Sequence, residues 1–204
     1  MNTAYIRHAL TAAIRVARFE KDAINDFDHS FEGFFRSFFL AFLISLPFYP
    51  ILVWGERMIA AEADAIGRGV DFAGLAPVGL GHYLVESGAY ILSWIVFPIA
   101  MIFVARLIGA AKHYVSYVVA YNWGSCIVLA VTLPPHILYL MGVISLDAMA
   151  LLYYPVIAFA LIYRWRVAQT ALELPGYTAT AVVIIDVLIS IFIAIGAARL
   201  QQGI

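Results

Sequence analysis

Five long stretches of this sequence are almost free of charged residues, and this pattern limits what the chain can fold into more than any other feature. The stretches are residues 34–54, 83–105, 114–133, 146–163 and 179–198. A helix that crosses a bilayer needs roughly 20 mainly apolar residues, within a range of about 17–25. Every stretch meets that length, so we predict an all-α integral membrane protein with five transmembrane helices over residues 34–200.

The composition favours a membrane protein over a soluble one. Residues of the AVILMFWYC class fill 64% of the 204 positions and charged residues only 12%, whereas an average soluble domain is roughly 25% charged. The net charge of −1 gives no basic field for nucleic acid, and the single Cys126 excludes disulfide frameworks and cysteine-ligated metal clusters. We therefore expect a lipid bilayer as the surrounding partner and no nucleic acid.

Proline and glycine interrupt several of the apolar stretches, at Pro47, Pro50, Pro98, Gly124 and Pro155. Membrane helices tolerate such residues because neighbouring helices satisfy the backbone groups that they free. We expect kinks at these positions.

The segment over residues 1–33 is too polar to cross a membrane. At 100° per residue its side chains divide into a polar face and an apolar face, which predicts an amphipathic helix on the cytoplasmic membrane surface. In that position Arg7, Arg15 and Arg18 would contact lipid headgroups, and the side with Ile6, Leu10 and Ile14 would lie against apolar surface. The alternative is a helix that packs on the protein's own cytoplasmic end. The run 28–32 supplies a helix cap before the first span.

The basic residues predict the orientation of the chain. If the N terminus is cytoplasmic, nine of the twelve lysines and arginines lie on that side: Arg7, Arg15, Arg18, Lys21, Arg36, Arg106, Lys112, Arg164 and Arg166. Arg57, Arg68 and Arg199 lie on the other side. The positive-inside rule then predicts a cytoplasmic N terminus and, after five spans, an external C terminus. This is the arrangement expected in a cell's inner (cytoplasmic) membrane, with the C terminus facing the periplasm.

Polar residues within the apolar stretches are the candidate functional groups, because each is costly in a bilayer unless it finds partners. Asp186 is the clearest, near the middle of the last stretch, and we expect no lysine or arginine at a matching depth in the other four. Asn122 lies at a comparable depth and could pair with it, Tyr121 is adjacent, and Glu86 can reach the outer interface. Asp186 could relay protons or cations, or it could anchor two helices; an anchor should tolerate Asp186→Asn.

Nothing in the sequence indicates catalysis. The five histidines, His8, His29, His82, His113 and His136, all fall at or outside the expected span ends, and no HExxH, Walker, EF-hand or GxSxG pattern occurs. We predict no catalytic residue, no metal site and no cofactor. Phenylalanines recur from Phe27 to Phe42 and cover one broad side of the first stretch and the residues before it. They could form part of the core, contact lipid, or bind a partner helix.

Two stretches resemble a known family. The run 112–125 (KHYVSYVVAYNWGS) is followed by Pro134 and Pro135, and the run 163–177 (YRWRVAQTALELPGY) opens onto an Ala-rich last span. With five spans, a cytoplasmic N terminus and a tiny external tail, this layout resembles the bacterial branch of the Yip family, named for its Rab/Ypt-interacting members. The resemblance implies a non-enzymatic membrane protein that works by association.

Three functions remain open from the sequence. The first is a membrane-embedded interaction or scaffold subunit, a homo-oligomer or part of a membrane complex. The second is a small transporter or channel with a polar path near Asp186 and Asn122; with five spans, such a path would form more readily between protomers. The third, an enzyme acting on lipid or quinone, is disfavoured because no paired acid, base or metal cluster is visible.

Overall fold

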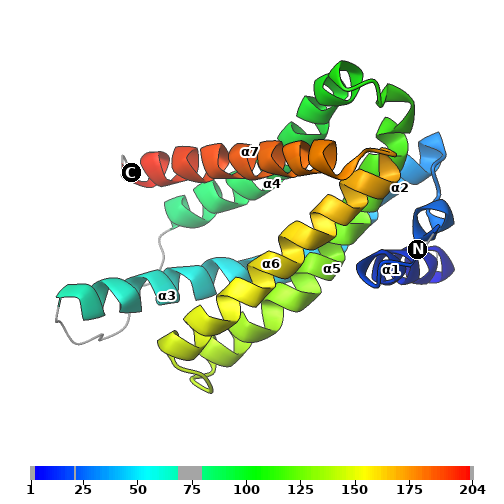
Figure 1. The fold of residues 1–204 in the computed structure, drawn as a ribbon. Coiled ribbons are helices and arrows are strands. Elements are labelled where there is room, and N and C mark those ends of the chain that lie inside the picture. Colours follow the sequence, from blue (N-terminus) through cyan, green and yellow to red (C-terminus); the bar gives the residue numbers. More distant parts are fainter. Residues whose placement is uncertain (1–2, 21, 69–79, 203–204) are drawn as a thin grey trace.

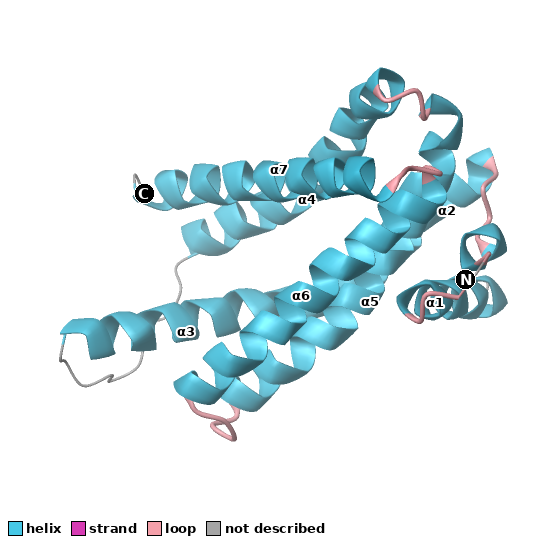
Figure 2. Ribbon diagram, in the orientation of Figure 1, coloured by secondary structure: helices cyan, strands magenta, loops and turns pink. Residues whose placement is uncertain are grey.

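The computed structural model describes residues 3–20, 22–68 and 80–202. Figure 1 shows these residues as a bundle of helices, and Figure 2 shows the short connections between them. The α-helices are α1 Thr3–Ala17, α2 Phe31–Ser45, α3 Tyr49–Arg68, α4 Leu80–Leu107, α5 Tyr114–Leu140, α6 Leu146–Ala171 and α7 Gly176–Gln202. Short 3-10 helices lie at Ala23–Asp26 (η1), Leu46–Phe48 (η2) and Ala111–His113 (η3).

Among the described residues, five helical segments are long and apolar enough to cross a membrane: Phe31–Gly67, Tyr83–Leu107, Ala111–Leu140, Leu146–Ala171 and Gly176–Gln201. Each contains one of the five expected stretches, so the number and place of the segments are as predicted. The helices extend beyond the apolar stretches because backbone hydrogen bonds continue through polar residues. The first of these stretches ends at residue 54, whereas α3 continues to Arg68.

Local chemistry sets the starts of two of these helices. The Ser30 hydroxyl accepts a hydrogen bond from the Gly33 amide at 3.0 Å, and Ser145 caps α6 in the same way through Ala148. The Asp28 carboxylate accepts a hydrogen bond from the Ser30 amide at 3.0 Å, and hydrogen bonds from Ser30 lower the pKa of Asp28. The helix cap expected before the first span is present.

The first span is broken. Helix α2 ends at Ser45 and α3 begins at Tyr49, with the 3-10 turn Leu46–Phe48 between them. Pro47 and Pro50 lie at this break, and proline cannot donate the backbone hydrogen bond that would keep an α-helix continuous. In contrast, Pro98 and Pro155 lie within helices that the structure records as unbroken.

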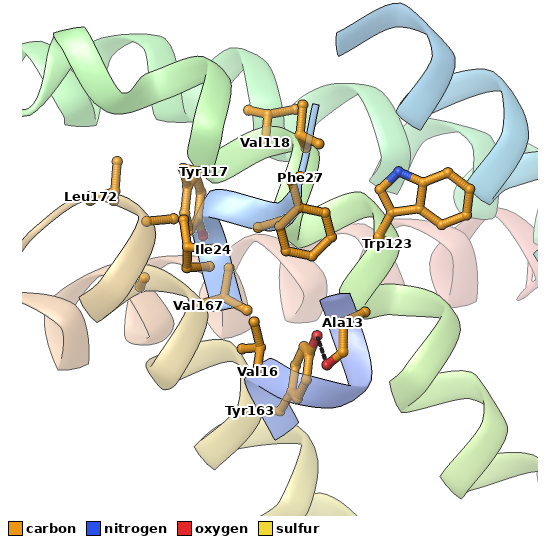
Figure 3. Packing of buried hydrophobic residues seen from close by; sticks show 14 of the residues in the cluster. Ala13, Val16, Ile24, Phe27, Tyr117, Val118, Trp123, Tyr163, Val167 and Leu172 are labelled. Carbon is orange, nitrogen blue, oxygen red and sulfur yellow. Dashed lines mark hydrogen bonds between the residues drawn. The ribbon is translucent and has the colours of Figure 1, made fainter. Parts of the chain in front are cut away.

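The buried core lies at the end of the bundle that carries the N terminus. Figure 3 shows apolar side chains from α1, η1, α5 and α6 meeting there, with Tyr117, Trp123 and Tyr163 among the largest. The Tyr163 hydroxyl donates a hydrogen bond to the Ala13 carbonyl at 3.1 Å. This contact joins α6 to α1 across most of the sequence.

Helix α1 packs on α5 and α6 through its small residues. Ala9, Ala12, Ala13 and Val16 are buried, whereas Ile14 is exposed. Small side chains let two helices approach closely, so the alanine side contacts the protein, and the stripe of Ile6, Leu10 and Ile14 lies beside it, partly or fully exposed. The alanine side of α1 therefore packs on the rest of the protein, as the alternative interpretation of this helix expected. Contact of the stripe of Ile6, Leu10 and Ile14 with lipid stays a prediction.

The long helices form two groups. Helices α4 and α7 pack together, α5 packs against α2, α3 and α6, and α7 also contacts α6. Figure 1 shows the α4–α7 pair meeting the other helices at the end nearest α2 and diverging from them toward the C terminus. The candidate functional site lies where these two groups face each other.

A candidate polar cavity inside the helical bundle

A buried ion pair joins α6 to α7. The guanidinium of Arg164 bonds to the carboxylate of Asp186, and the side chains are only 28% and 3% exposed, respectively. Tyr121 of α5 completes the cluster: its hydroxyl donates to Asp186 Oδ1 at 2.9 Å and accepts from Arg164 Nη1 at 2.6 Å. Three helices are therefore held together by one charged and hydrogen-bonded cluster.

The ion pair corrects the expectation that no basic residue matches Asp186 in depth. The apolar stretch ends at Tyr163, which placed Arg164 at the end of the span. Helix α6 continues to Ala171, so Arg164 lies seven residues inside it, and Asp186 lies ten residues into α7. Because α6 and α7 are joined by a short turn and run in opposite directions, the two side chains meet. An apolar stretch in the sequence ends at the first charged residue, but the helix itself can continue beyond that residue.

The aromatic rings around the cluster limit how Arg164 can lie. Its guanidinium carbon is 5.0 Å from the centroid of the Tyr121 ring, a cation–π arrangement. Phe97 of α4 packs on Tyr121 with ring centroids 4.6 Å apart. Tyr117 lies one helical turn before Tyr121, and the centroids of these two rings are 5.9 Å apart. Phe97 and Tyr117 are buried, so both rings cover Tyr121, and Phe97 also lines the cavity.

A cavity of about 230 Å³ opens on the other side of the ion pair. Most of its lining residues come from α3, α4, α5 and α7, with Ser45 from α2 and Arg164 from α6, and Arg164, Asp186 and Tyr121 lie at one end. On α5 its lining extends from Tyr121 to Thr132, eleven residues, or about 16 Å at 1.5 Å per residue. Hydroxyl groups dominate its polar lining: Ser45, Tyr49, Tyr90, Ser93, Ser125, Thr132 and Ser190.

The break in the first span lies at this cavity. Ser45, the last residue of α2, and Tyr49, the first residue of α3, both line it. The Tyr49 and Tyr90 rings stack with centroids 4.0 Å apart. Discontinuous membrane helices commonly form binding sites, because unwound backbone is tolerated where it borders a cavity or protein. Pro47 and Pro50 were the sequence signal for this feature.

Asn122 lines the cavity but does not pair with Asp186. Its side-chain amide donates to the Ser37 hydroxyl of α2 at 3.0 Å. Consecutive residues of a helix point about 100° apart, so Tyr121 turns toward α7 and Asn122 toward α2. The suggested pairing of Asn122 with Asp186 was wrong, although both residues border the same cavity.

Glu86 lies apart from the other three candidates. The Tyr49 hydroxyl donates to its carbonyl at 2.8 Å, and the Gln201 amide bonds to its carboxylate. Glu86 therefore ties α4 to α3 and α7 near the C-terminal end of the bundle and is not among the cavity-lining residues. The structure brings Asp186, Asn122 and Tyr121 together and places Glu86 outside.

The three candidate surface arginines differ in their surroundings. Arg15 forms ion pairs with Glu20 and Asp26, so its charge is used within the protein. Arg7 and Arg18 are exposed. Contact of these side chains with lipid headgroups remains a prediction, most directly for Arg7 and Arg18.

One histidine lies where the sequence did not place it. His136 is inside α5, only 1% exposed, and its Nε2 lies 3.0 Å from Glu56 Oε1 of α3. The expectation that all five histidines fall at or outside span ends is wrong for His136, because α5 continues past Pro134 and Pro135 to Leu140. Within the described residues, no group of three or more His, Cys, Asp or Glu side chains is placed to hold a metal ion.

Comparison of the chain with models of protein families, with curated proteins and with solved structures gave no match. The resemblance to the Yip family therefore stays a prediction. What the fold and the site define is a class: the part of the chain that the structure describes is helical, with five segments long and apolar enough to cross a membrane, and these segments line a cavity beside an ion pair.

Proposed function

We propose that this chain is a non-enzymatic multi-pass membrane protein that binds a small polar solute in the cavity and passes it across, as a small transporter or channel. The observation that carries this proposal is the cavity that ends at Arg164 and Asp186. Its wall is mainly apolar, and five of its hydroxyl groups bond to backbone carbonyls of their own helices. A core built only for stability would not need the ion pair beside this space, because charged groups in a membrane interior are costly. Of the two leading hypotheses from the sequence, the geometry favours the second.

The charges in the cavity indicate the class of solute. Arg164 and Asp186 neutralise each other, and the other polar lining groups are hydroxyls and one amide. Aromatic rings of Tyr49, Tyr90 and Trp94 add apolar wall. A neutral or zwitterionic solute rich in hydrogen-bonding groups fits this lining better than an ion of either sign, which would find no uncompensated counter-charge among the described lining residues.

The proposal includes an orientation. Nine of the twelve lysines and arginines lie on the N-terminal side and three on the other side. We place the N terminus in the cytoplasm and the C terminus in the periplasm of an inner-membrane protein. The cavity, which runs from Tyr121 toward Thr132 on α5, then extends toward the periplasmic side.

Cysteine labelling tests whether the cavity contains water. In a Cys126→Ala background, Ser93→Cys and Ser190→Cys place a thiol on the cavity wall. Ile95→Cys and Ile191→Cys, on the same two helices, place one on the outer surface, which would face lipid. A charged, membrane-impermeant methanethiosulfonate reagent should modify the first pair and leave the second pair largely unmodified.

Solute flux tests the function itself. Proteoliposomes should equilibrate glycerol, urea or glycine faster than empty liposomes when followed by light scattering. Ser93→Trp should fill the cavity and abolish the difference, whereas Ile95→Trp, on the outer surface of the same helix, should leave it unchanged. Unmodified cavity cysteines, together with flux equal to that of empty liposomes for every solute, would rule the proposal out.

A second candidate is an interaction or scaffold subunit, favoured by the aromatic side of α2. Phe31, Phe35 and Phe39 lie on one side of the helix and are 81%, 55% and 66% exposed. A second copy of this chain or a partner helix could pack there. This candidate is tested by measuring the particle mass in detergent of the natural chain and of the double variant Phe35→Ala/Phe39→Ala. If both are monomers, self-association through this side of α2 is ruled out.

A further inference from the structure

One edge of the Arg164 guanidinium is free at the end of the cavity. The hydrogen bonds that Arg164 makes with described residues, to Asp186 and to the Tyr121 hydroxyl, both come from Nη1. Nε and Nη2 have no hydrogen-bond partner among the described residues, and neither atom is sealed from solvent. Because Arg164 lines the cavity, these two nitrogens are available to a solute there. Their N–H groups point the same way and form a fork that matches the two oxygens of a carboxylate.

The hydroxyl groups one helical turn farther along the cavity present acceptors instead. Ser125 lies one turn after Tyr121 on α5, and its hydroxyl donates to the Tyr121 carbonyl at 3.1 Å. Ser190 lies one turn after Asp186 on α7, and its hydroxyl donates to the Asp186 carbonyl at 3.0 Å. A hydroxyl group has one hydrogen and two lone pairs. Since both hydrogens are used within the helices, the two oxygens offer the cavity lone pairs, which accept hydrogen bonds from a solute.

The charges at this end of the cavity decide which carboxylate can bind there. Arg164 and Asp186 neutralise each other, so a carboxylate that shares Arg164 brings one uncompensated negative charge into a membrane interior. That charge is costly unless a positive charge enters with it. An ammonium group on the same solute supplies the positive charge, and its three N–H donors suit the acceptor oxygens of Ser125 and Ser190.

The rest of the lining suits an apolar group of modest size. The wall includes Trp94, Val128, Leu129 and Ile193, so a solute that extends past the charged end meets mainly apolar surface. The cavity volume of about 230 Å³ is smaller than the roughly 300–1,000 Å³ of pockets for drug-sized ligands. The solute is therefore a smaller molecule, with two opposite charges at one end and an apolar group at the other.

We propose that the cavity binds an aliphatic amino acid, with its carboxylate on the free edge of Arg164, its ammonium on Ser125 and Ser190, and its side chain against the apolar wall. This assignment rests on the proposed function and names the solute class for it. Asp186 and Tyr121 are positioning residues in this site, because they hold Nη1 and so fix the direction of the free edge.

Binding of radiolabelled L-leucine to the natural protein in detergent, measured by scintillation proximity, tests the solute class. Two unlabelled analogues each lack one charged group: isocaproate is leucine without the ammonium, and isoamylamine is leucine without the carboxylate. Each should compete at least roughly tenfold more weakly than unlabelled L-leucine, because hydrogen bonds to charged groups are lost. Glycine keeps both charges but has no side chain, and it should also compete at least roughly tenfold more weakly.

Two pairs of variants test the place of the site. Arg164→Lys keeps the positive charge but has no second edge, so leucine should bind at least roughly tenfold more weakly. Arg166→Lys, on the same helix and not among the cavity-lining residues, is the matched control and should bind leucine like the natural chain. Ser125→Ala/Ser190→Ala removes both acceptors and should weaken binding roughly tenfold or more. Thr132→Val removes a hydroxyl at the far end of the cavity and should not.

The outcomes separate this assignment from the proposed function. If either analogue competes as well as leucine, the amino-acid site is overturned; this series uses the natural chain and decides the matter even if Arg164→Lys does not fold. A protein that binds no leucine, although its proteoliposomes equilibrate glycerol and urea, overturns the site and leaves the proposed function standing. Leucine binding without flux of leucine or any other solute supports the site and overturns passage through the cavity. Absence of both binding and flux overturns both proposals.

Discussion

Replacing Asp186 by asparagine should destabilise the protein, although it keeps the size of the side chain. The sequence alone suggested that an anchoring Asp186 would tolerate this change. In the structure, however, the substitution leaves the buried guanidinium of Arg164 without its counter-charge. Removing one partner of a buried ion pair costs roughly 3–5 kcal/mol. Since the Arg164 side chain is 28% exposed, we expect the lower end, about 3 kcal/mol.

A double-mutant cycle separates the ion pair from other effects of the substitution. Arg164→Gln alone leaves the Asp186 carboxylate, 3% exposed, with the Tyr121 hydroxyl as its remaining partner in the cluster. The double variant Arg164→Gln/Asp186→Asn carries no charge, and its two amides can bond to each other. It should lose less stability than the sum of the single variants, by about 2–3 kcal/mol.

Thermal unfolding in detergent measures these differences. For a chain of this length, 1 kcal/mol corresponds to roughly 2–4 °C, so Asp186→Asn should lower the midpoint by roughly 6–12 °C. Tyr121→Phe is the control, because it removes a hydroxyl but leaves both charges in place, and it should cost about 1.5 kcal/mol, the lower end for a hydrogen bond to a charged group. An Asp186→Asn midpoint equal to that of the natural chain, or strictly additive losses in the cycle, would refute the reasoning.

Three further predictions follow from packing and charge. Gly124→Ala should lower the free energy of unfolding by about 1–3 kcal/mol, because the added Cβ would lie 2.4 Å from the Tyr163 ring. Gly88→Ala is the control and should not destabilise the protein, because no atom lies within 4 Å of its added Cβ. Thermal midpoints in detergent compare the two variants. Tags should be accessible from the cytoplasm at the N terminus and from the periplasm at the C terminus, and finding both on one side contradicts five spans. Replacing Ile6, Leu10 and Ile14 by asparagine should expose residues 1–20 to protease in membranes but not in detergent; unchanged protection in membranes contradicts lipid contact by that stripe.

The number and order of the five apolar segments could be predicted from the sequence because their causes are local. Length and hydropathy mark each segment, and the hydroxyl of Ser30 caps the helix that begins next to it. Pro47 and Pro50 mark the break in the first span, since a missing backbone donor acts within one turn. Asp186, Asn122 and Tyr121 could be singled out for the same reason: a polar residue inside an apolar stretch is visible without knowing its partner.

The partners were decided only by the tertiary structure. Asp186 meets Arg164 because α6 extends past its apolar stretch and turns back into α7, and Asn122 meets Ser37 of α2 instead. His136 meets Glu56 across 80 positions of sequence. Helical hydrogen bonds join residues four apart, so sequence reports them well. Which side chains face each other depends on how distant helices rotate and pack, and no local pattern records that.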